Sequence, residues 1–331
     1  MPAQAETRTS PEPSGLPSAP QPTREPWKRT LWIGKALITV AVISYMLWRL
    51  DGARFAESLA NIDAPIMASA IVALTVQMVV QAAAWFTLLR AADSVLPFGV
   101  VARITFVSLF FNQFVPASVG GVGTRILLAS RENVRWATAS STVVAERIVY
   151  IVGLIVLAVL TYPRLVGLRV GRFDAWYLVG FSTAIGLGGL FLWKAEWLTH
   201  VWQRAPILRR LSPTLLSARQ LLGFSRPLDV SIAFLLILVY HALTFFAVWR
   251  IAVAIGSNIE FFIIAALLPH VFLISVLPIS VNGWGVREAA MVGMLAFAGV
   301  DAELAFMTSA FYGIGILLTR LPMGFLWLAV R

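Results

Sequence analysis

A ten-residue pattern occurs twice in the chain, at 116–125 and 278–287. The first copy reads PASVGGVGTR and the second PISVNGWGVR, so both share the pattern P-x-S-V-[GN]-G-x-G-x-R. Glycine allows positive φ and close backbone approach, and proline ends a preceding helix. The planar guanidinium of arginine can hold two oxygens of a phosphate or carboxylate. Each copy interrupts a long apolar stretch, which is typical of a transport site in a membrane protein with two matched halves.

The repeated pattern and the polar residues before it are therefore predicted to bind substrate. A short helix after each pattern would direct its free backbone N–H groups, with an arginine in its first turn, toward an anion. The alternative is a Gly/Pro turn between packed helices, with each arginine reaching the membrane interface and the amides joining helices. The candidate binding residues are Asn112, Gln113, Ser118, Gly120, Gly121, Gly123, Arg125, Ser280, Asn282, Gly283, Gly285 and Arg287.

Acidic residues within the apolar parts of the two halves are limited to Glu146 and Glu288. Glu288 follows Arg287 directly, so the second copy carries its own counter-charge. The first copy has Ile126 at that place and must take a counter-charge from elsewhere, for which Glu146, beside Arg147, is the candidate. Such pairs either neutralise arginine at membrane depth or release it when a headgroup arrives, and a glutamate could also carry a coupling proton.

The composition indicates an all-α polytopic integral membrane protein. Hydrophobic residues make up 59% of the chain, charged residues 13%, and the mean hydropathy is +0.82. The net charge of +10 comes from basic residues that mostly flank apolar spans, which favours anionic lipid headgroups over nucleic acid as partners. There is no cysteine, the three histidines are isolated, and neither G-x-G element continues into a nucleotide fingerprint. We therefore expect no metal and no cofactor.

The apolar segments predict about six full spans and two broken re-entrant hairpins. The units 64–162 and 228–329 each hold a span, a hairpin and a span, and the offset that aligns the patterns also places Tyr150 over Tyr312. Each unit crosses the membrane an even number of times and one span separates them, so they must face opposite ways, as inverted repeats. The predicted spans are 31–50, 64–90, 137–162, 175–193, 228–255 and 303–329, and the hairpin pieces are 100–115 with 119–130 and 261–277 with 284–298.

The remaining segments indicate how the chain is oriented. Residues 1–27 are rich in proline and polar residues and predict a disordered cytosolic tail before a single transmembrane domain, 28–331. The basic segment 194–227 predicts an amphipathic loop on the cytoplasmic leaflet, which favours a cytoplasmic N-terminus in the inner (plasma) membrane. Three arginines in 163–174 oppose that orientation.

Three segments resemble a known family: 111–121 (FNQFVPASVGG), the Glu146–Arg147 pair and 277–288 (LPISVNGWGVRE). They are similar to the flippase-like transmembrane domain of lysylphosphatidylglycerol synthases, over about 31–330. In that family the domain is associated with moving lipids between leaflets, and aminoacyl transfer belongs to a separate soluble domain. Because the chain ends at Arg331, the resemblance implies translocation without synthesis. Val122 stands where many relatives carry a charge, which implies a different headgroup or a less polar first site.

The expected function is therefore a lipid flippase, not an enzyme, that moves a polar-headed, phospholipid-type lipid by alternating access of its repeats. One alternative is an integral-membrane transferase acting on a lipid or polyprenyl-linked substrate, although no acidic metal-binding cluster supports it. Another is a non-transporting membrane partner of a lipid-synthesis enzyme. A lipid-modifying enzyme and a second copy of the chain, as a homo-oligomer, are the candidate protein partners, and the lipid headgroup stays open.

Overall fold

A computed structural model describes residues 60–114, 119–165, 226–276 and 285–328, with short pieces at 44, 169–170, 173–174, 180, 183, 214 and 216–222. The described residues are almost all helical. Besides the turns and loops that connect the helices, the described chain has one antiparallel pair of two-residue strands, β1 (Arg169–Val170) and β2 (Phe173–Asp174). The predicted tail at 1–27, almost all of the predicted spans 31–50 and 175–193, and most of the basic loop lie outside the described residues.

Among the described residues, four helices are long and apolar enough to cross a membrane: α3 (Ala64–Ala91), α6 (Trp136–Thr161), α10 (Pro227–Ala254) and α13 (Ala302–Arg320). After α6 comes η2 (Tyr162–Arg164), and α13 continues through η4 (Leu321–Met323) into α14 (Gly324–Leu328). Asp63 starts α3 by accepting a hydrogen bond from the Ile66 amide, and a proline lies in the first turn of both α3 and α10. Four predicted spans are thereby confirmed, and the chain is a multi-pass membrane protein.

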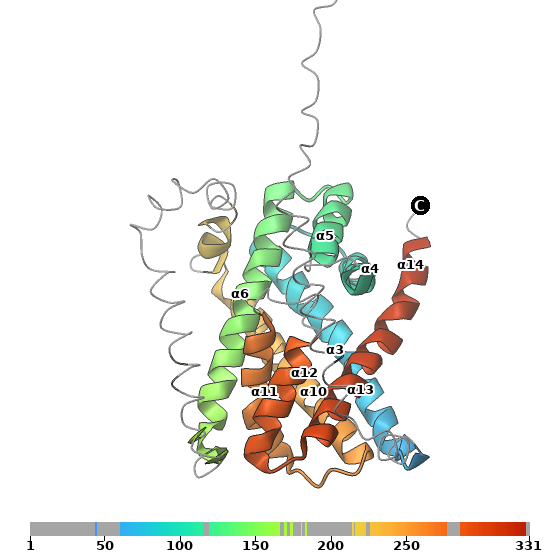
Figure 1. Ribbon diagram of the computed structural model, residues 1–331. Coiled ribbons are helices and arrows are strands. Elements are labelled where there is room, and N and C mark those ends of the chain that lie inside the picture. The colour runs from blue at the N-terminus through green and yellow to red at the C-terminus, as the bar shows by residue number, and fades with distance from the viewer. Residues whose placement is uncertain are drawn as a thin grey trace, which may run out of the picture.

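Shorter helices fill the places of the predicted hairpin pieces. The first pair is α4 (Phe98–Phe114) and α5 (Val119–Arg131), and the second is α11 (Phe261–Val276) and α12 (Val286–Leu295), which is followed by η3 (Ala296–Ala298). Figure 1 shows α4 and α5 near the beginning of α6, and α11 and α12 toward its other end. The two pairs therefore lie in opposite halves of the bundle.

The described glycines of the first pattern have helical backbone angles. Because α5 begins at Val119, Gly120, Gly121 and Gly123 are helical and need no positive φ, and Arg125 lies in the second turn of α5. Among the described glycines of the two patterns, positive φ occurs at Gly285, where it is 83° just before α12. The helix predicted at 119–130 is thus confirmed, but Arg125 lies one turn later in it than predicted, and positive φ is found at Gly285 rather than at the described glycines of the first copy.

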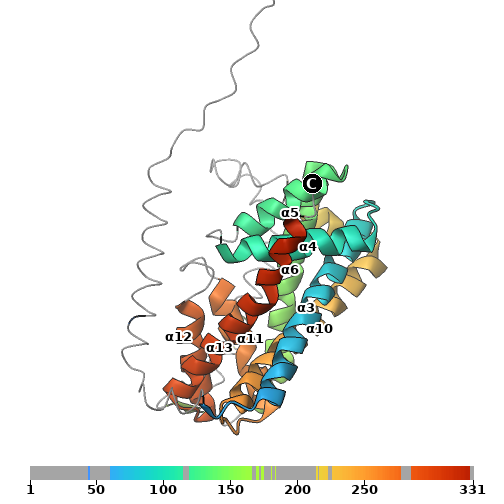
Figure 2. The same cartoon turned by 90° about the vertical axis from the view of Figure 1, so that its right-hand side faces the viewer.

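Helices α3 and α10 pack side by side in opposite directions (Figure 2). At one end the Asp63 amide donates to the Ala254 carbonyl at 3.1 Å, and at the other Arg90 lies 3.5 Å from Asp229. Both helices bury several alanines, which allow the two backbones to approach closely where lipid supplies no hydrophobic driving force. This antiparallel pair packs the first helices of the two units against each other.

The other long helices pack around this pair. Helix α6 runs in the same direction as α10 (Figure 1), and the side chain of His241 on α10 fits against Gly153 of α6. Helix α14 reaches back over α4, where a Cβ on Gly324 would lie only 2.6 Å from the Phe110 ring. The last described helix thus covers the hairpin of the first unit.

Candidate functional site

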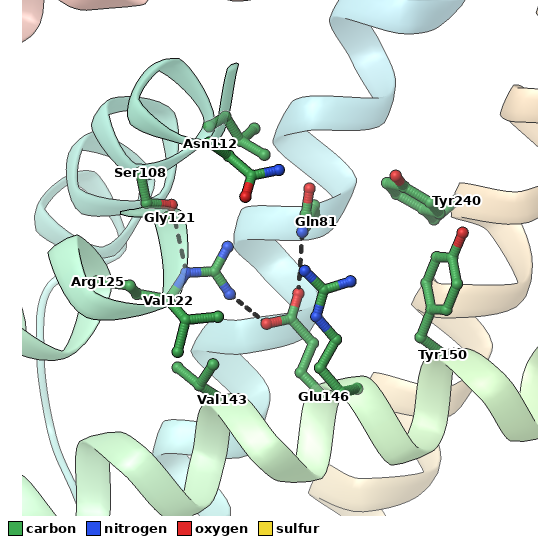
Figure 3. A pocket seen from close by; sticks show the side chains of 12 residues that line it. Gln81, Ser108, Asn112, Gly121, Val122, Arg125, Val143, Glu146, Tyr150 and Tyr240 are labelled. Atoms are coloured by element: carbon green, nitrogen blue, oxygen red, sulfur yellow. Dashed lines mark hydrogen bonds and ion pairs between the residues drawn. The ribbon is translucent and has the colours of Figure 1, made fainter. Parts of the chain in front are cut away.

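The centre of the site is a buried ion pair between two helices. Arg125 of α5 donates through Nη1 to Oε2 of Glu146 on α6, and both side chains are almost completely buried. Glu146 accepts a second hydrogen bond at Oε1 from Gln81 Nε2 of α3, at 3.2 Å, and Arg125 Nε lies 3.4 Å from Ser108 Oγ of α4 (Figure 3). The Arg125 guanidinium also lies over the Trp85 ring, 4.8 Å from its centroid. Four helices of the first unit therefore each position one polar side chain of this network.

A close contact between α4 and α5 places Arg125. A Cβ on Gly121 would lie 2.9 Å from both Asn112 Cβ and the Ser108 carbonyl oxygen, so only glycine fits. Arg125 follows four residues later on the same helical face and thus points at α4 and α6. The glycine of the pattern acts here through close packing.

Beside the ion pair lies a cavity of about 90 Å³. This volume has room for several water molecules or for a phosphate-sized group. Figure 3 shows Ser108 and Asn112 on one side of it and the tyrosine rings on the other. The lining residues are Gln81, Ser108, Leu109, Asn112, Gly121, Val122, Arg125, Val143, Glu146, Arg147, Tyr150 and Tyr240.

One face of α6 supplies a third of this lining. Val143, Glu146, Arg147 and Tyr150 recur at the three- and four-residue spacing that places side chains on one helical face. Arg147 is exposed, and in the described part of the chain no hydrogen bond or ion pair joins its guanidinium. Because it lies near the middle of an apolar helix, this cation faces the cavity at membrane depth.

A second buried ion pair lies in the other half of the bundle. Arg287 of α12 donates to Oε1 of its neighbour Glu288, from Nη2 at 2.5 Å and from Nε at 3.1 Å. Ser309 of α13 lies within 3.3 Å of both side chains, and Oε2 of Glu288 accepts from the Gly285 amide at 2.5 Å. The Arg287 guanidinium lies over the Tyr312 ring at 5.3 Å. None of these residues lines the cavity, and the side chains of Arg287 and Glu288 are buried.

Comparison with known proteins supplies the family. A family model described as the lysylphosphatidylglycerol synthase TM region matches residues 32–324, which include α3 through α13 and every residue that lines the cavity. The chain belongs to this family. No curated protein and no solved structure matches it. Membership of the lysylphosphatidylglycerol synthase TM family associates the chain with a membrane region of lipid-synthesising enzymes.

In this member of the lysylphosphatidylglycerol synthase TM family, part of the predicted site converges. Asn112, Gly121, Arg125, Glu146 and Arg147 all line the cavity. The predicted counter-charge for Arg125 is confirmed, because the partner of Glu146 is Arg125 and not its neighbour Arg147. The role of these residues in binding stays a prediction.

The other predicted residues lie elsewhere. Gln113 donates to the Leu109 carbonyl of its own helix at 3.3 Å, and neither Gly120 nor Gly123 lines the cavity. Gly285, Arg287 and Glu288 form the second cluster. Ser118, Ser280, Asn282 and Gly283 lie outside the described residues.

Four polar lining residues were not predicted as part of the site: Gln81, Ser108, Tyr150 and Tyr240. Gln77 and Gln81 lie one helical turn apart, a spacing that indicates hydrogen bonds between packed helices. Gln77 does donate to Thr244 of α10, whereas Gln81 donates to Glu146 in the site. The sequence did hold a signal for Tyr150, because the offset that aligns the two patterns places it over Tyr312. Tyr150 lines the cavity together with Arg125, and the Tyr312 ring lies against Arg287. Among the described residues, no group of three or more His, Asp or Glu could hold a metal ion.

Proposed function

We propose that the protein is a lipid translocase that moves a polar-headed lipid between the two leaflets. The observation that carries this proposal is the cavity lined by Arg125, Glu146 and Arg147. Charged side chains within membrane-spanning segments are costly to insert, and those that face a cavity mark the path of a substrate. The headgroup would enter this cavity while the acyl chains stay in the bilayer.

The order and direction of the helices support alternating access between inverted repeats. In both units a long helix is followed by two short helices and a second long helix, and α3 and α10, which begin the two units, lie antiparallel. The buried arginines, Arg125 and Arg287, occupy the same position of the repeated pattern. Such repeats form one site that opens to each leaflet in turn when one unit rocks against the other.

The two arginine clusters differ in whether they line the cavity. The cluster of Arg125 lines an open cavity, whereas that of Arg287 does not line it and is held by Glu288 and Ser309. In this proposal the structure corresponds to the state in which the first half-site is accessible, and the exchange of the two arrangements carries the headgroup across. No bond is made or broken, and the driving force is a difference in lipid concentration or an ion gradient.

Translocation can be measured in proteoliposomes that hold a fluorescent phospholipid in both leaflets. Addition of an impermeant reductant bleaches the outer leaflet, and a translocase makes the inner pool accessible as well. We expect wild type to empty the inner pool faster than protein-free liposomes, and Arg125→Ala and Arg287→Ala to be slow. Arg135→Ala, which removes an exposed arginine just before α6 that makes no side-chain cap, is the control.

Each variant is first checked for folding by its melting temperature in detergent. A Glu146→Gln, Arg125→Gln double variant keeps the buried site uncharged if the single arginine variant is too unstable to reconstitute. Equal rates for wild type and protein-free liposomes would refute translocation, and equal rates for wild type and folded arginine variants would refute this site.

A further inference from the structure

We infer that the cavity selects a lipid whose headgroup is a net-anionic phosphate diester with a hydrogen-bond donor, and that Arg147 binds the phosphate. This inference rests on the proposed function and names its substrate class. The charged residues of the lining are Arg125, Glu146 and Arg147. Since Arg125 and Glu146 neutralise each other, the lining keeps one uncompensated positive charge.

The position of Arg147 makes this charge a binding group. It lies near the middle of α6, is exposed to the cavity, and takes part in no ion pair or hydrogen bond among the residues that the structure describes. A buried, paired arginine such as Arg125 cannot take a substrate without breaking its bond to Glu146. Arg147 needs no such exchange, and its guanidinium can hold two phosphate oxygens at once.

A cation without a counter-charge at membrane depth is also energetically unfavourable. Its insertion is unfavourable unless an anion or water compensates it, so an anionic headgroup in the cavity would stabilise the protein as well as bind to it. A cationic headgroup would meet a like charge instead. The lining therefore discriminates by the net charge of the headgroup.

Gln81 supplies the second element of recognition. Its Nε2 donates to Glu146, whereas its buried Oε1 has no hydrogen-bond partner among the described residues. A buried acceptor without a partner is costly, and a hydroxyl of the headgroup would satisfy it. Tyr150 and Tyr240 also line the cavity, and a tyrosine hydroxyl can donate to a phosphate oxygen. These groups fit a phosphate diester that carries a hydroxyl, such as a glycerol headgroup.

The second unit has no charged residue at the position that corresponds to Arg147. With the offset that aligns the two patterns, Ser309 occupies the position of Arg147, and it bonds to Arg287 and Glu288. The pairing of arginine with glutamate is thus common to both units, while the unpaired cation that lines the cavity belongs to the first. We therefore assign selectivity to Arg147 rather than to the arginine of the repeated pattern.

The test compares three fluorescent lipids in the proteoliposome assay: phosphatidylglycerol, which is anionic and bears hydroxyls, zwitterionic phosphatidylcholine, and cationic lysylphosphatidylglycerol. Loss of one charge-assisted contact predicts that wild type prefers the anionic lipid by about tenfold or more, and that Arg147→Gln removes this preference. Arg147→Lys should keep most of it. Arg135→Gln, which removes an equal charge from an exposed position outside the cavity, should keep all of it.

The outcomes separate this inference from the proposed function. Equal translocation of the three lipids by wild type would overturn the inference and leave the translocase intact, as would a folded Arg147→Gln variant with unchanged preference. No translocation of any lipid would overturn the proposed function itself. The last part of the test uses proteoliposomes loaded with inorganic phosphate. Release of phosphate without movement of lipid would show that the site carries a soluble anion, and would overturn both the inference and the proposed function.

Discussion

Arg125 and Glu146 show how a buried charge is tolerated in an apolar helical protein. Their ion pair is completed by Ser108, Gln81 and the ring of Trp85, so both charged groups have several partners. Such a pair adds little net stability over apolar residues of the same size, but removal of one partner leaves an uncompensated charge. Neutralisation of Arg125 by Glu146 is therefore compatible with the substrate binding that we propose, because Arg147 lines the same cavity outside this pair.

A double-mutant cycle tests this coupling. Arg125→Gln and Glu146→Gln should each lower the free energy of unfolding by about 3–5 kcal/mol, because each leaves the other charge buried alone. The double variant should lose clearly less than the sum. Reversible unfolding of the purified protein in mixed detergent micelles measures all three values.

Arg103 and Glu132 provide the matched control for this cycle. They lie 3.0 Å apart, but more than a third of each side chain is exposed, and such pairs contribute about 0–1 kcal/mol. Their glutamine variants should change stability little. A coupling energy no larger at the buried pair than at this exposed pair would mean that Arg125 and Glu146 are not held together in a desolvated site.

At the scale of helices, the contact between α4 and α5 determines where Arg125 points. Gly121→Ala would place a Cβ 2.9 Å from Asn112 and from the Ser108 carbonyl, so α5 must shift away from α4. Overpacking of this kind costs about 1–3 kcal/mol. We expect a lower melting temperature and slower lipid translocation, since the shift also moves the arginine.

Gly123→Ala is the control for this substitution. It changes the same residue type in the same helix, but nothing lies within 4 Å of the added Cβ. Because alanine favours a helix over glycine by about 0.5–1 kcal/mol, this variant should be as stable as wild type or slightly more stable. If both variants melt at the same temperature, close packing is not the reason for glycine at 121.

The helices could be predicted from the sequence much better than their contacts. Long apolar runs placed α3 and α10 almost to the residue, because proline and Asp63 mark their starts. The partner of Arg125 could be proposed because acidic residues within the apolar parts are so few. The helix at 119–130 could also be predicted, but the backbone angles of its glycines could not, because glycine adopts positive φ and helical angles about equally readily.

The cavity itself could not be predicted from the sequence. Its residues come from five helices, and local patterns do not determine how these helices rotate against one another. Tyr240, for example, reaches the cavity from α10, which begins the second unit, whereas most of the lining belongs to the first. Only the tertiary packing shows that these groups surround the same space.

At the scale of the whole molecule, the account requires the two units to face opposite ways. The ends of α3 and α10 lie at opposite ends of the bundle, so the connections that follow them should lie on opposite sides of the membrane. Because the chain has no cysteine, labelling of a single introduced cysteine shows on which side of the membrane that cysteine lies. Val95→Cys follows α3 and Asn258→Cys follows α10, and both positions are exposed.

An impermeant maleimide added to intact cells should label one of these two variants and spare the other until the membrane is opened. Two further exposed positions provide the check: Ala137→Cys at the beginning of α6 should behave like Val95→Cys, and Ala302→Cys at the beginning of α13 like Asn258→Cys. Labelling of Val95→Cys and Asn258→Cys from the same side would exclude the inverted arrangement.

The central claim is that the cavity carries a lipid headgroup across the membrane. Its most direct measurement is the initial rate at which fluorescent phosphatidylglycerol leaves the inner leaflet of proteoliposomes, compared with protein-free liposomes of the same composition. We expect a clear increase with wild type, about a tenfold decrease of that protein-dependent rate with Arg147→Gln, and no change with Arg135→Gln. A wild-type rate equal to that of protein-free liposomes would contradict it.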